Sequence, residues 1–466
     1  MTKESQQFDK MVNTPVKKLV ITLGIPTIIS MLITAIYNIA DTFFVSQLGK
    51  AVSGAVSVVF PLQAVIQAIG FTLGMGGGSV ISSLLGQKKD KEAQEVGSSS
   101  FYLALILGLL ICAISLIFMN PLLELLGATE NGFVHAKNYA KYIVIGAPIM
   151  TGSFVLNNLL RSEGKSKLAM IGLTVGGLLN IGLDPLLINT FDMGISGAAI
   201  ATLTSQIISF SILLSMFIFK KSIIKLSPYM ISKEFTVYSE ILKVGFPSFC
   251  RQAFVCLATI LLNNQASKYG EMIGPEVNDA AQSAMGIVGK IVTVIFTVSL
   301  GIGQGYQPVC GYNYHSKRYE RVKEATLFTF YFMTIVMIFL STFFFIFAEN
   351  VMNLFIDDEM VVKFGVKALR WQCFAMPFVS INTICNMTYQ STKQKVKAVI
   401  LSCCRQGIFF IPLILLLPLF IGLDGVIVSQ SIADLITCIF SIFFFISLIR
   451  EINYKIEQTK SEIELV

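Results

Sequence analysis

Three acidic residues lie within long apolar stretches of the chain, where an ionisable side chain is costly and is by default a candidate for function. They are Asp41, Asp184 and Asp434. Asn180 lies four residues before Asp184, so the two side chains share one face of a helix. With a rise of about 1.5 Å per residue, Asp41, Asp184 and Thr202 all fall in the outer half of a membrane-spanning bundle. We therefore expect Asp41, Asn180, Asp184 and Thr202 to meet in one polar cluster.

The chemistry of this cluster is that of a cation site. Two carboxylates with amide and hydroxyl oxygens form a hard-oxygen set that suits Na⁺ and serves equally as a proton site. Repulsion between neighbouring carboxylates in a medium of low dielectric favours uptake of either ion. Pro185 removes a helix hydrogen bond and leaves the Ile181 carbonyl available to an ion or a neighbouring group. In the alternative interpretation, Asp41 and Asp184 lie at a solvated outer rim or cap helix ends.

Basic residues also occur within the apolar stretches, at Arg251, Lys290 and Arg405. We expect Asp434, Arg405 and Lys290 to form an internal ion pair with a structural role. The second half of the chain offers Phe409 and Leu413 where the first half has Asn180 and Asp184. Cation coupling is therefore predicted to be confined to the first half.

The composition predicts an all-α integral membrane protein. Hydrophobic residues make up 54% of the 466 residues and charged residues only 14%, against about 25% charged residues in a typical soluble domain. About 20 apolar residues span a bilayer. The sequence predicts twelve transmembrane helices, near residues 19–47, 53–84, 98–126, 139–160, 168–190, 194–219, 237–268, 280–312, 325–348, 364–391, 397–419 and 422–449.

The distribution of Lys and Arg predicts the orientation of these helices. The N-terminal segment and every second loop are basic, as in the loop that holds Arg161, Lys165 and Lys167. Because cytoplasmic loops carry an excess of Lys and Arg, we place both termini in the cytoplasm and the protein in the plasma membrane. The net charge of +7 thus reflects topology, and no nucleic-acid partner is expected.

The sequence repeats itself. Gly24 and Pro26 match Gly245 and Pro247, and Pro148, Asn157, Gly194 and Gly197 match Pro377, Asn386, Gly422 and Gly425. Each half holds six predicted spans, an even number, so the halves form a parallel repeat with a central cavity between them. We expect an N-terminal lobe over 1–219, an inter-lobe linker over 220–236, a C-terminal lobe over 237–449 and a cytoplasmic tail over 450–466.

An enzyme is not expected. The nine cysteines contain no CxxC pair, and the two histidines, His135 and His315, lie far apart without a nucleophile motif. No cofactor is predicted, and Na⁺ is the single metal considered. An adaptable apolar cavity would suit many substrates, and the candidate lining residues are Met31, Tyr37, Phe60, Met75, Met150, Phe154, Asn157 and Met285.

The chain resembles the multidrug and toxic compound extrusion (MATE) family over about residues 12 to 449. The resemblance rests on LGIPTIISMLITAIYNIADTFFVSQLG, NNLLRSEGKSKLAM, LNIGLDPLLI and GISGAAIATLTSQ, and it is greatest to drug exporters of low-GC Gram-positive bacteria. It implies export of organic cations and amphipathic toxins driven by H⁺ or Na⁺. The family's cation site carries over onto Asp41, Asn180, Asp184 and Thr202, with the Ala198 carbonyl as a further ligand. Some branches also place acids in the C-terminal lobe, where this chain has Asn263, Asn264, Asn382 and Asn386.

The function expected from these features is an antiporter that exports small cationic or amphipathic molecules by alternating access. A monomer surrounded by membrane lipid is expected. Two alternatives from the same wider superfamily stay open, a flippase for a lipid-linked precursor and a metabolite exporter. The sequence does not choose between H⁺ and Na⁺ as the coupling ion.

Overall fold

The computed structural model describes residues 3–128 and 130–464, and within them all regular secondary structure is helical, with no strand. The first half contains α1 (Lys3–Asn13), α2 (Val16–Ser46), α3 (Lys50–Gly86), α4 (Asp90–Ile117), α5 (Met119–Leu125), α6 (Glu130–Ile145), α7 (Ala147–Ser162), α8 (Ser166–Pro185), a π-helical turn (Leu186–Thr190) and α9 (Gly194–Ile218).

After a short 3-10 turn (Pro228–Met230), the second half follows the same order. It contains α10 (Phe235–Glu271), α11 (Pro275–His315), α12 (Tyr319–Ile346), α13 (Ala348–Asn353), α14 (Glu359–Ala375), a 3-10 turn (Met376–Phe378), α15 (Val379–Ser391), α16 (Lys395–Cys403), a π-helical turn (Cys404–Phe409), α17 (Phe410–Ile421) and α18 (Leu423–Glu464).

Within the described residues, ten helices are long and apolar enough to cross a membrane, or eleven if one bent pair is a single span. Two of the twelve predicted spans are missing from these ten helices, the fourth and the tenth, which occupy matching positions in the two halves. The fourth is bent by 46° between Gly132–Ile145 and Ala147–Ser162, where Pro148 follows the break. The tenth, predicted over 364–391, is divided into α14 and α15 by the turn that contains Pro377. Proline lacks the N–H group that would continue each helix.

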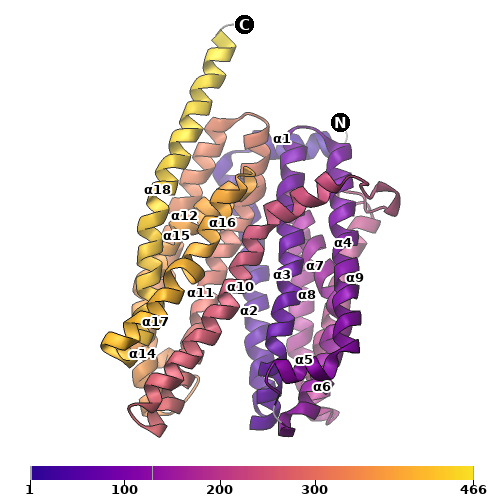
Figure 1. The fold of residues 1–466 in the computed structure, drawn as a ribbon. Helices are drawn as coiled ribbons and strands as arrows, with labels where there is room; N and C mark the ends of the chain where they lie inside the picture. The colour runs from indigo at the N-terminus through magenta and orange to yellow at the C-terminus, as the bar shows by residue number, and fades with distance from the viewer. Residues whose placement is uncertain (1–2, 129, 465–466) are drawn as a thin grey trace.

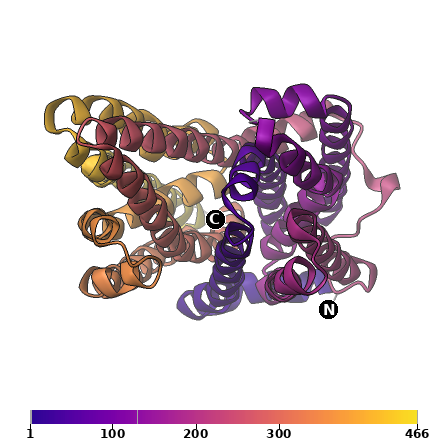
Figure 2. The ribbon, with the colours of Figure 1, turned by 90° about the horizontal axis from the view of Figure 1, so that it is seen from below.

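The helices form two bundles that lie side by side, α2–α9 and α10–α18 (Figures 1 and 2). Their internal hydrogen bonds repeat. Asn157 Nδ2 donates to the Ala169 carbonyl at 2.9 Å, and Asn386 Nδ2 donates to the Ala398 carbonyl at 2.7 Å. Gly194 and Gly422, which also match in the repeat, both have a positive φ, of 53° and 58°. The repeat seen in the sequence is therefore a repeat of structure.

The bundles contact each other through two matching helix pairs. Helix α2 of the first bundle packs on α11 of the second, and α10 of the second packs on α3 of the first. Glycines make both contacts close. A Cβ atom on Gly76 would collide with the Ile241 carbonyl and the Gly245 backbone, and one on Gly305 would collide with the Gly24 backbone. The glycine-rich segments of the second and eighth predicted spans thus permit close backbone approach between the bundles.

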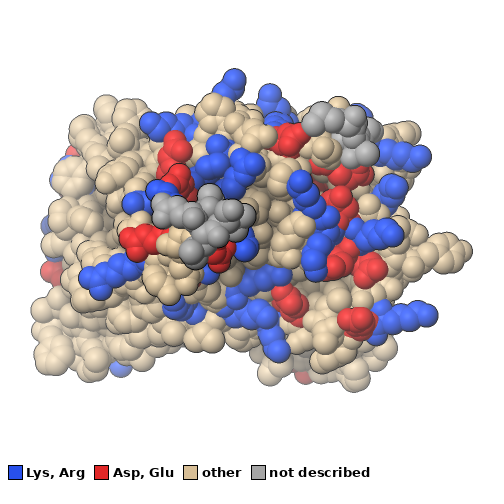
Figure 3. Space-filling model, turned by 90° about the horizontal axis from the view of Figure 1, so that it is seen from above, with Lys and Arg blue, Asp and Glu red and all other residues tan. Residues whose placement is uncertain are grey.

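Both termini lie at the end of the molecule where these contacts concentrate, and Lys and Arg side chains are spread over that end (Figures 1 and 3). Two segments tie the bundles together there. Helix α1 joins them, since Gln7 donates to the Glu163 carbonyl and Asn313 donates to the Met11 carbonyl. Segment 219–234 connects α9 to α10, and the buried Glu163 carboxylate accepts hydrogen bonds from the Ile223 and Ile224 amides at 2.8 and 3.1 Å.

The last helix is longer than the sequence predicts. The expected span over 422–449 and the described part of the expected tail over 450–466 belong to one continuous helix, α18, which extends beyond the rest of the molecule as far as Glu464 (Figure 1). Residues 465 and 466 lie outside the described residues. Glu451 anchors its extension to the C-terminal bundle by accepting from Gln394 at 2.7 Å and lying 3.5 Å from the Lys397 ammonium.

Candidate cation site and cavities

The predicted polar cluster is centred on Asn180 in the N-terminal bundle. The Asn180 amide nitrogen lies 3.5 Å from Asp184 Oδ1 and 3.4 Å from Thr202 Oγ1. These three side chains come from α8 and α9 and are almost fully buried, with Asp184 completely so. Asp41, from α2, interacts electrostatically with the Asp184 carboxyl group. The structure therefore brings Asn180, Asp184 and Thr202 together, with Asp41 within electrostatic range of Asp184.

Several buried oxygen atoms in this cluster have no hydrogen-bond donor in the described part of the chain. Asp41 Oδ1, Asp184 Oδ2 and Asn180 Oδ1 are buried and have no hydrogen-bond partner among the described residues. A buried polar atom left unpaired costs about 1–3 kcal/mol. Carboxylate and amide oxygens of this kind suit a cation, and one bound Na⁺ or one added proton would satisfy part of this deficit.

Local structure explains how Asp184 reaches the cluster. Helix α8 ends at Pro185 and continues as the π-helical turn Leu186–Thr190, so Asp184 stands at the junction of two helix types. Single π turns interrupt the regular hydrogen bonds of a helix and recur at functional sites. Ala198 is fully buried one turn before Thr202 on α9, the position that a backbone ligand from this helix would take.

Two tyrosines and a glutamine surround the acids. The Tyr139 hydroxyl interacts electrostatically with both Asp41 and Asp184. Tyr37 lies one helical turn before Asp41 on α2, and its hydroxyl contacts the Gln206 side chain. Tyr139 and Gln206 were not predicted from the sequence. Gln206 follows Thr202 by four residues on α9, and this spacing could have indicated it.

A cavity in the N-terminal bundle, which we call the N-terminal cavity, lies beside the cation cluster at Tyr37. Four predicted residues line it, namely Met31, Tyr37, Phe154 and Asn157. Phe71 and Phe154 form an apolar wall, with ring centroids 4.6 Å apart. Tyr37 belongs to both the cavity and the surroundings of Asp41, so the two sites are adjacent through α2.

The other predicted cavity residues lie elsewhere. Met75 lines a second, smaller cavity between the bundles, which we call the seam cavity. Phe60 is 55% exposed, and Met150 and Met285 are buried in the apolar cores of the two bundles. Neither cavity contains these three residues.

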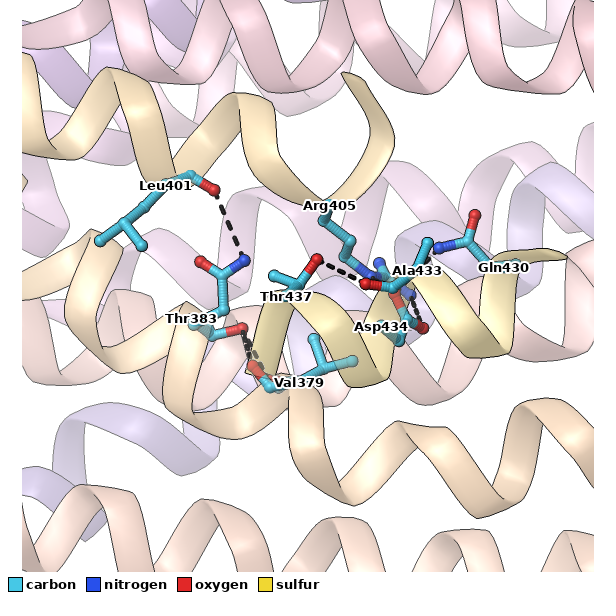
Figure 4. A network of polar contacts seen from close by, with 10 residues as sticks. Val379, Thr383, Leu401, Arg405, Gln430, Ala433, Asp434 and Thr437 are labelled. Atoms are coloured by element: carbon cyan, nitrogen blue, oxygen red, sulfur yellow. Dashed lines mark hydrogen bonds and ion pairs between the residues drawn. The ribbon is translucent and has the colours of Figure 1, made fainter. Parts of the chain in front are cut away.

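The C-terminal bundle has a different polar centre, between the π-helical turn Cys404–Phe409 and α18. Arg405 Nε and Nη2 donate to Asp434 Oδ1 and Oδ2 at 2.8 and 3.1 Å, and Gln430 donates to Asp434 Oδ1 at 2.9 Å (Figure 4). This pair is buried and its charges are balanced. The predicted ion pair is thus confirmed for Arg405, whereas Lys290 is exposed and does not take part.

The asparagines of the C-terminal bundle do not form a second cation cluster. Asn263 and Asn264 are exposed, whereas Asn382 and Asn386 are buried and donate to the Leu401 and Ala398 carbonyls. Within the described residues, no group of three or more His, Cys, Asp or Glu side chains is placed to hold a metal ion.

The chain is similar to known proteins along nearly its whole length. The MatE family model matches residues 26–186 and 272–416. Multidrug export protein MepA of Staphylococcus saprophyticus is 28% identical over 431 residues, which cover 92% of this chain and 93% of that protein. MepA of Staphylococcus aureus strain MRSA252 is 26% identical over 422 residues, which cover 90% and 91%.

Solved structures agree with this match. An outward-facing conformation of a multidrug resistance MATE family transporter has a TM-score of 0.90 at 26% identity, covering 98% of this chain and 99% of that chain. A MATE crystal structure in the straight conformation has a TM-score of 0.89 at 26% identity, with 98% and 100% coverage.

Proposed function

Because the chain belongs to the MATE family of multi-pass membrane transporters, we propose that it is a cation-coupled antiporter that exports organic cations and other small amphipathic molecules. The relatives named as multidrug exporters support this proposal. The observation that carries it is the position of Tyr37 and Asp41 on successive turns of α2, one lining the apolar cavity and the other in the cation cluster.

This arrangement offers a direct route for coupling. Binding of one H⁺ or Na⁺ among Asp41, Asp184, Asn180, Thr202 and the Ala198 carbonyl would balance the charge of one of the two carboxylates, remove their mutual repulsion and draw α2 toward α8 and α9. The same movement shifts Tyr37 and narrows the neighbouring cavity, which releases the substrate. The cation drives transport only if it binds the two conformations with different affinity.

Alternating access follows from the contacts between the bundles. These contacts gather at the end that carries the termini and many Lys and Arg residues, which we assign to the cytoplasm by the positive-inside rule (Figure 3). The cavity then opens to the outside, as in the outward-facing relative. In this proposal the lobes 1–219 and 237–449 rock in the plasma membrane about the linker 220–236, and the monomer is the working unit.

Transport by the purified protein in liposomes tests the proposal. Ethidium, a cationic dye, is supplied outside vesicles, and a proton gradient or a sodium gradient is imposed separately. Transporters whose cytoplasmic side faces the external solution should move the dye into the vesicles. We expect at least one of the two gradients to drive this accumulation. Equal accumulation with and without both gradients would contradict cation coupling.

A further inference from the structure

The side chain of Arg161, near the end of α7, is buried between the two bundles. It is 4% exposed, and its Nη1 donates to Gln304 Oε1 on α11, in the opposite bundle. Its Nε and Nη2 have no hydrogen-bond partner among the described residues, and neither has Gln304 Nε2. Three buried N–H donor atoms therefore lack acceptors at one place in the seam.

The charge of Arg161 is also uncompensated. Among the described residues, no carboxylate pairs with its guanidinium group, whose hydrogen-bond partner is the neutral Gln304 side chain. Glu163 is two residues away, but its carboxylate is bound by Lys165 and by the amides of Ile223 and Ile224. Leaving a buried charge without a partner is strongly unfavourable, so this position favours an anionic group that comes from outside the described chain.

The two unpartnered nitrogens of Arg161 form one edge of the guanidinium fork. The chain itself shows what that edge binds, because Arg405 uses the same two atoms, Nε and Nη2, to hold both carboxylate oxygens of Asp434 (Figure 4). Such bidentate pairing is specific for planar carboxylates and for phosphates.

Arg161 also lies where a polar and an apolar space meet. It lines the seam cavity together with Ser79, Ser82 and Gln304, and it lines the N-terminal cavity together with Phe71 and Phe154. Neither set of lining residues includes a carboxylate. Arg251 adds a second positive charge from the opposite bundle, where its Nη2 lies 3.7 Å from the sulfur of Met75.

We propose that Arg161 binds the carboxylate or phosphate end of an amphipathic ligand whose apolar part occupies the N-terminal cavity. The inference deepens the proposed export function and rests on it, because it assigns acidic amphipathic molecules to the substrates. The anionic end lies against Nε and Nη2 of Arg161, and the rings of Phe71 and Phe154 contact the apolar part.

Binding of a matched pair of probes tests this site without any gradient. Radiolabelled 1-naphthaleneacetate and 1-naphthaleneacetamide share one ring system and differ in charge, and both are measured by scintillation proximity on the full-length protein in phosphatidylcholine nanodiscs. We expect the wild type to prefer the carboxylate by about 10- to 100-fold, or about 1.4 to 2.8 kcal/mol at about 1.4 kcal/mol per tenfold. Equal affinities in the wild type would overturn the proposal, whatever the variants do.

Three variants test whether the preference for the carboxylate probe depends on Arg161. We expect Arg161→Gln to bind the two probes equally and Arg161→Lys, which keeps the charge but not the fork, to retain part of the preference. Lys290→Gln removes a positive charge from a predicted span that lines neither cavity, and the preference should persist. A full preference in Arg161→Gln would overturn the assignment to Arg161.

A further measurement with an anionic lipid distinguishes a lipid phosphate from a soluble acid as the group that occupies the site. If phosphatidylglycerol in the nanodiscs weakens carboxylate binding to the wild type but not to Arg161→Gln, a lipid phosphate competes for the site. If it has no effect, the site takes soluble amphipathic acids. Because binding is measured without transport, the two failures are distinguishable. Failure of ethidium export would contradict the proposed function and, with it, the role of the bound acid as a substrate, whereas loss of the probe preference would contradict only the binding site at Arg161.

Discussion

Asn157 and Asn386 make the same hydrogen bond in the two halves of the molecule, each to the carbonyl group twelve residues further along the chain. Each bond joins the helix that follows a proline break to the next helix, α7 to α8 and α15 to α16. The surroundings differ, however. Asn386 also donates to Ser402 Oγ at 2.7 Å, whereas Asn157 lines the N-terminal cavity.

Replacement of these asparagines should therefore have unequal effects on stability. Asn386→Ala removes two buried hydrogen bonds, to the Ala398 carbonyl and to the Ser402 hydroxyl, each worth about 0.5–1.5 kcal/mol. Asn157→Ala removes one such bond, to the Ala169 carbonyl, beside a cavity that can admit water. We expect the larger fall in the melting temperature of the detergent-purified protein for Asn386→Ala, and a larger fall for Asn157→Ala would contradict this interpretation.

The close contact at Gly305 should control how tightly the bundles meet. A Cβ atom there would collide with the Gly24 backbone, whereas one on Gly289, in the same helix α11, would meet no atom within 4 Å. Gly289→Ala should stabilise the protein by up to about 1 kcal/mol through helix propensity. Gly305→Ala should instead lower the melting temperature and increase the labelling of Cys310, which is buried in the native protein. Equal behaviour of the two variants would argue against a tight seam.

Much of this fold could be predicted from local features of the sequence. Long apolar runs identify most of the spans, and repeated glycines and prolines identify the two halves, because both signals reside in neighbouring residues. The acids in the cation cluster were likewise visible, since Asp41 and Asp184 interrupt apolar stretches. Pro148 and Pro377 match in the repeat, and their type is compatible with either a kink or a helix end, but only the structure shows that each marks a break in a span.

Features that depend on contact between the bundles could not be predicted. Arg161 belongs to a basic segment with Lys165 and Lys167, which made it resemble a loop residue, and its burial depends on Gln304 from the opposite bundle. Lys290 was expected to join Arg405 and Asp434 because all three lie in apolar stretches. The face of the helix on which Lys290 lies is exposed, and membrane depth alone does not reveal this.

The Arg405–Asp434 pair yields a stability prediction. Asp434→Asn leaves the Arg405 charge buried without its partner, and breaking a buried pair in this way costs about 3–5 kcal/mol. The double replacement Arg405→Met with Asp434→Leu removes both charges, and it should recover most of the lost thermal stability. A double variant that is less stable than Asp434→Asn would show that the charges, rather than their balance, stabilise this bundle.

The central claim is that Asp41 couples cation binding to export, and the most direct test compares two Asp→Asn variants in liposomes. Asp192 is an exposed acid of the same bundle with a φ of 51°, a backbone conformation that asparagine tolerates. Asp192→Asn therefore serves as the matched control for Asp41→Asn. Under the gradient that drives the wild type, we predict ethidium accumulation by Asp192→Asn and none by Asp41→Asn at equal amounts of inserted protein. Gradient-driven accumulation by Asp41→Asn at the wild-type rate would contradict the claim.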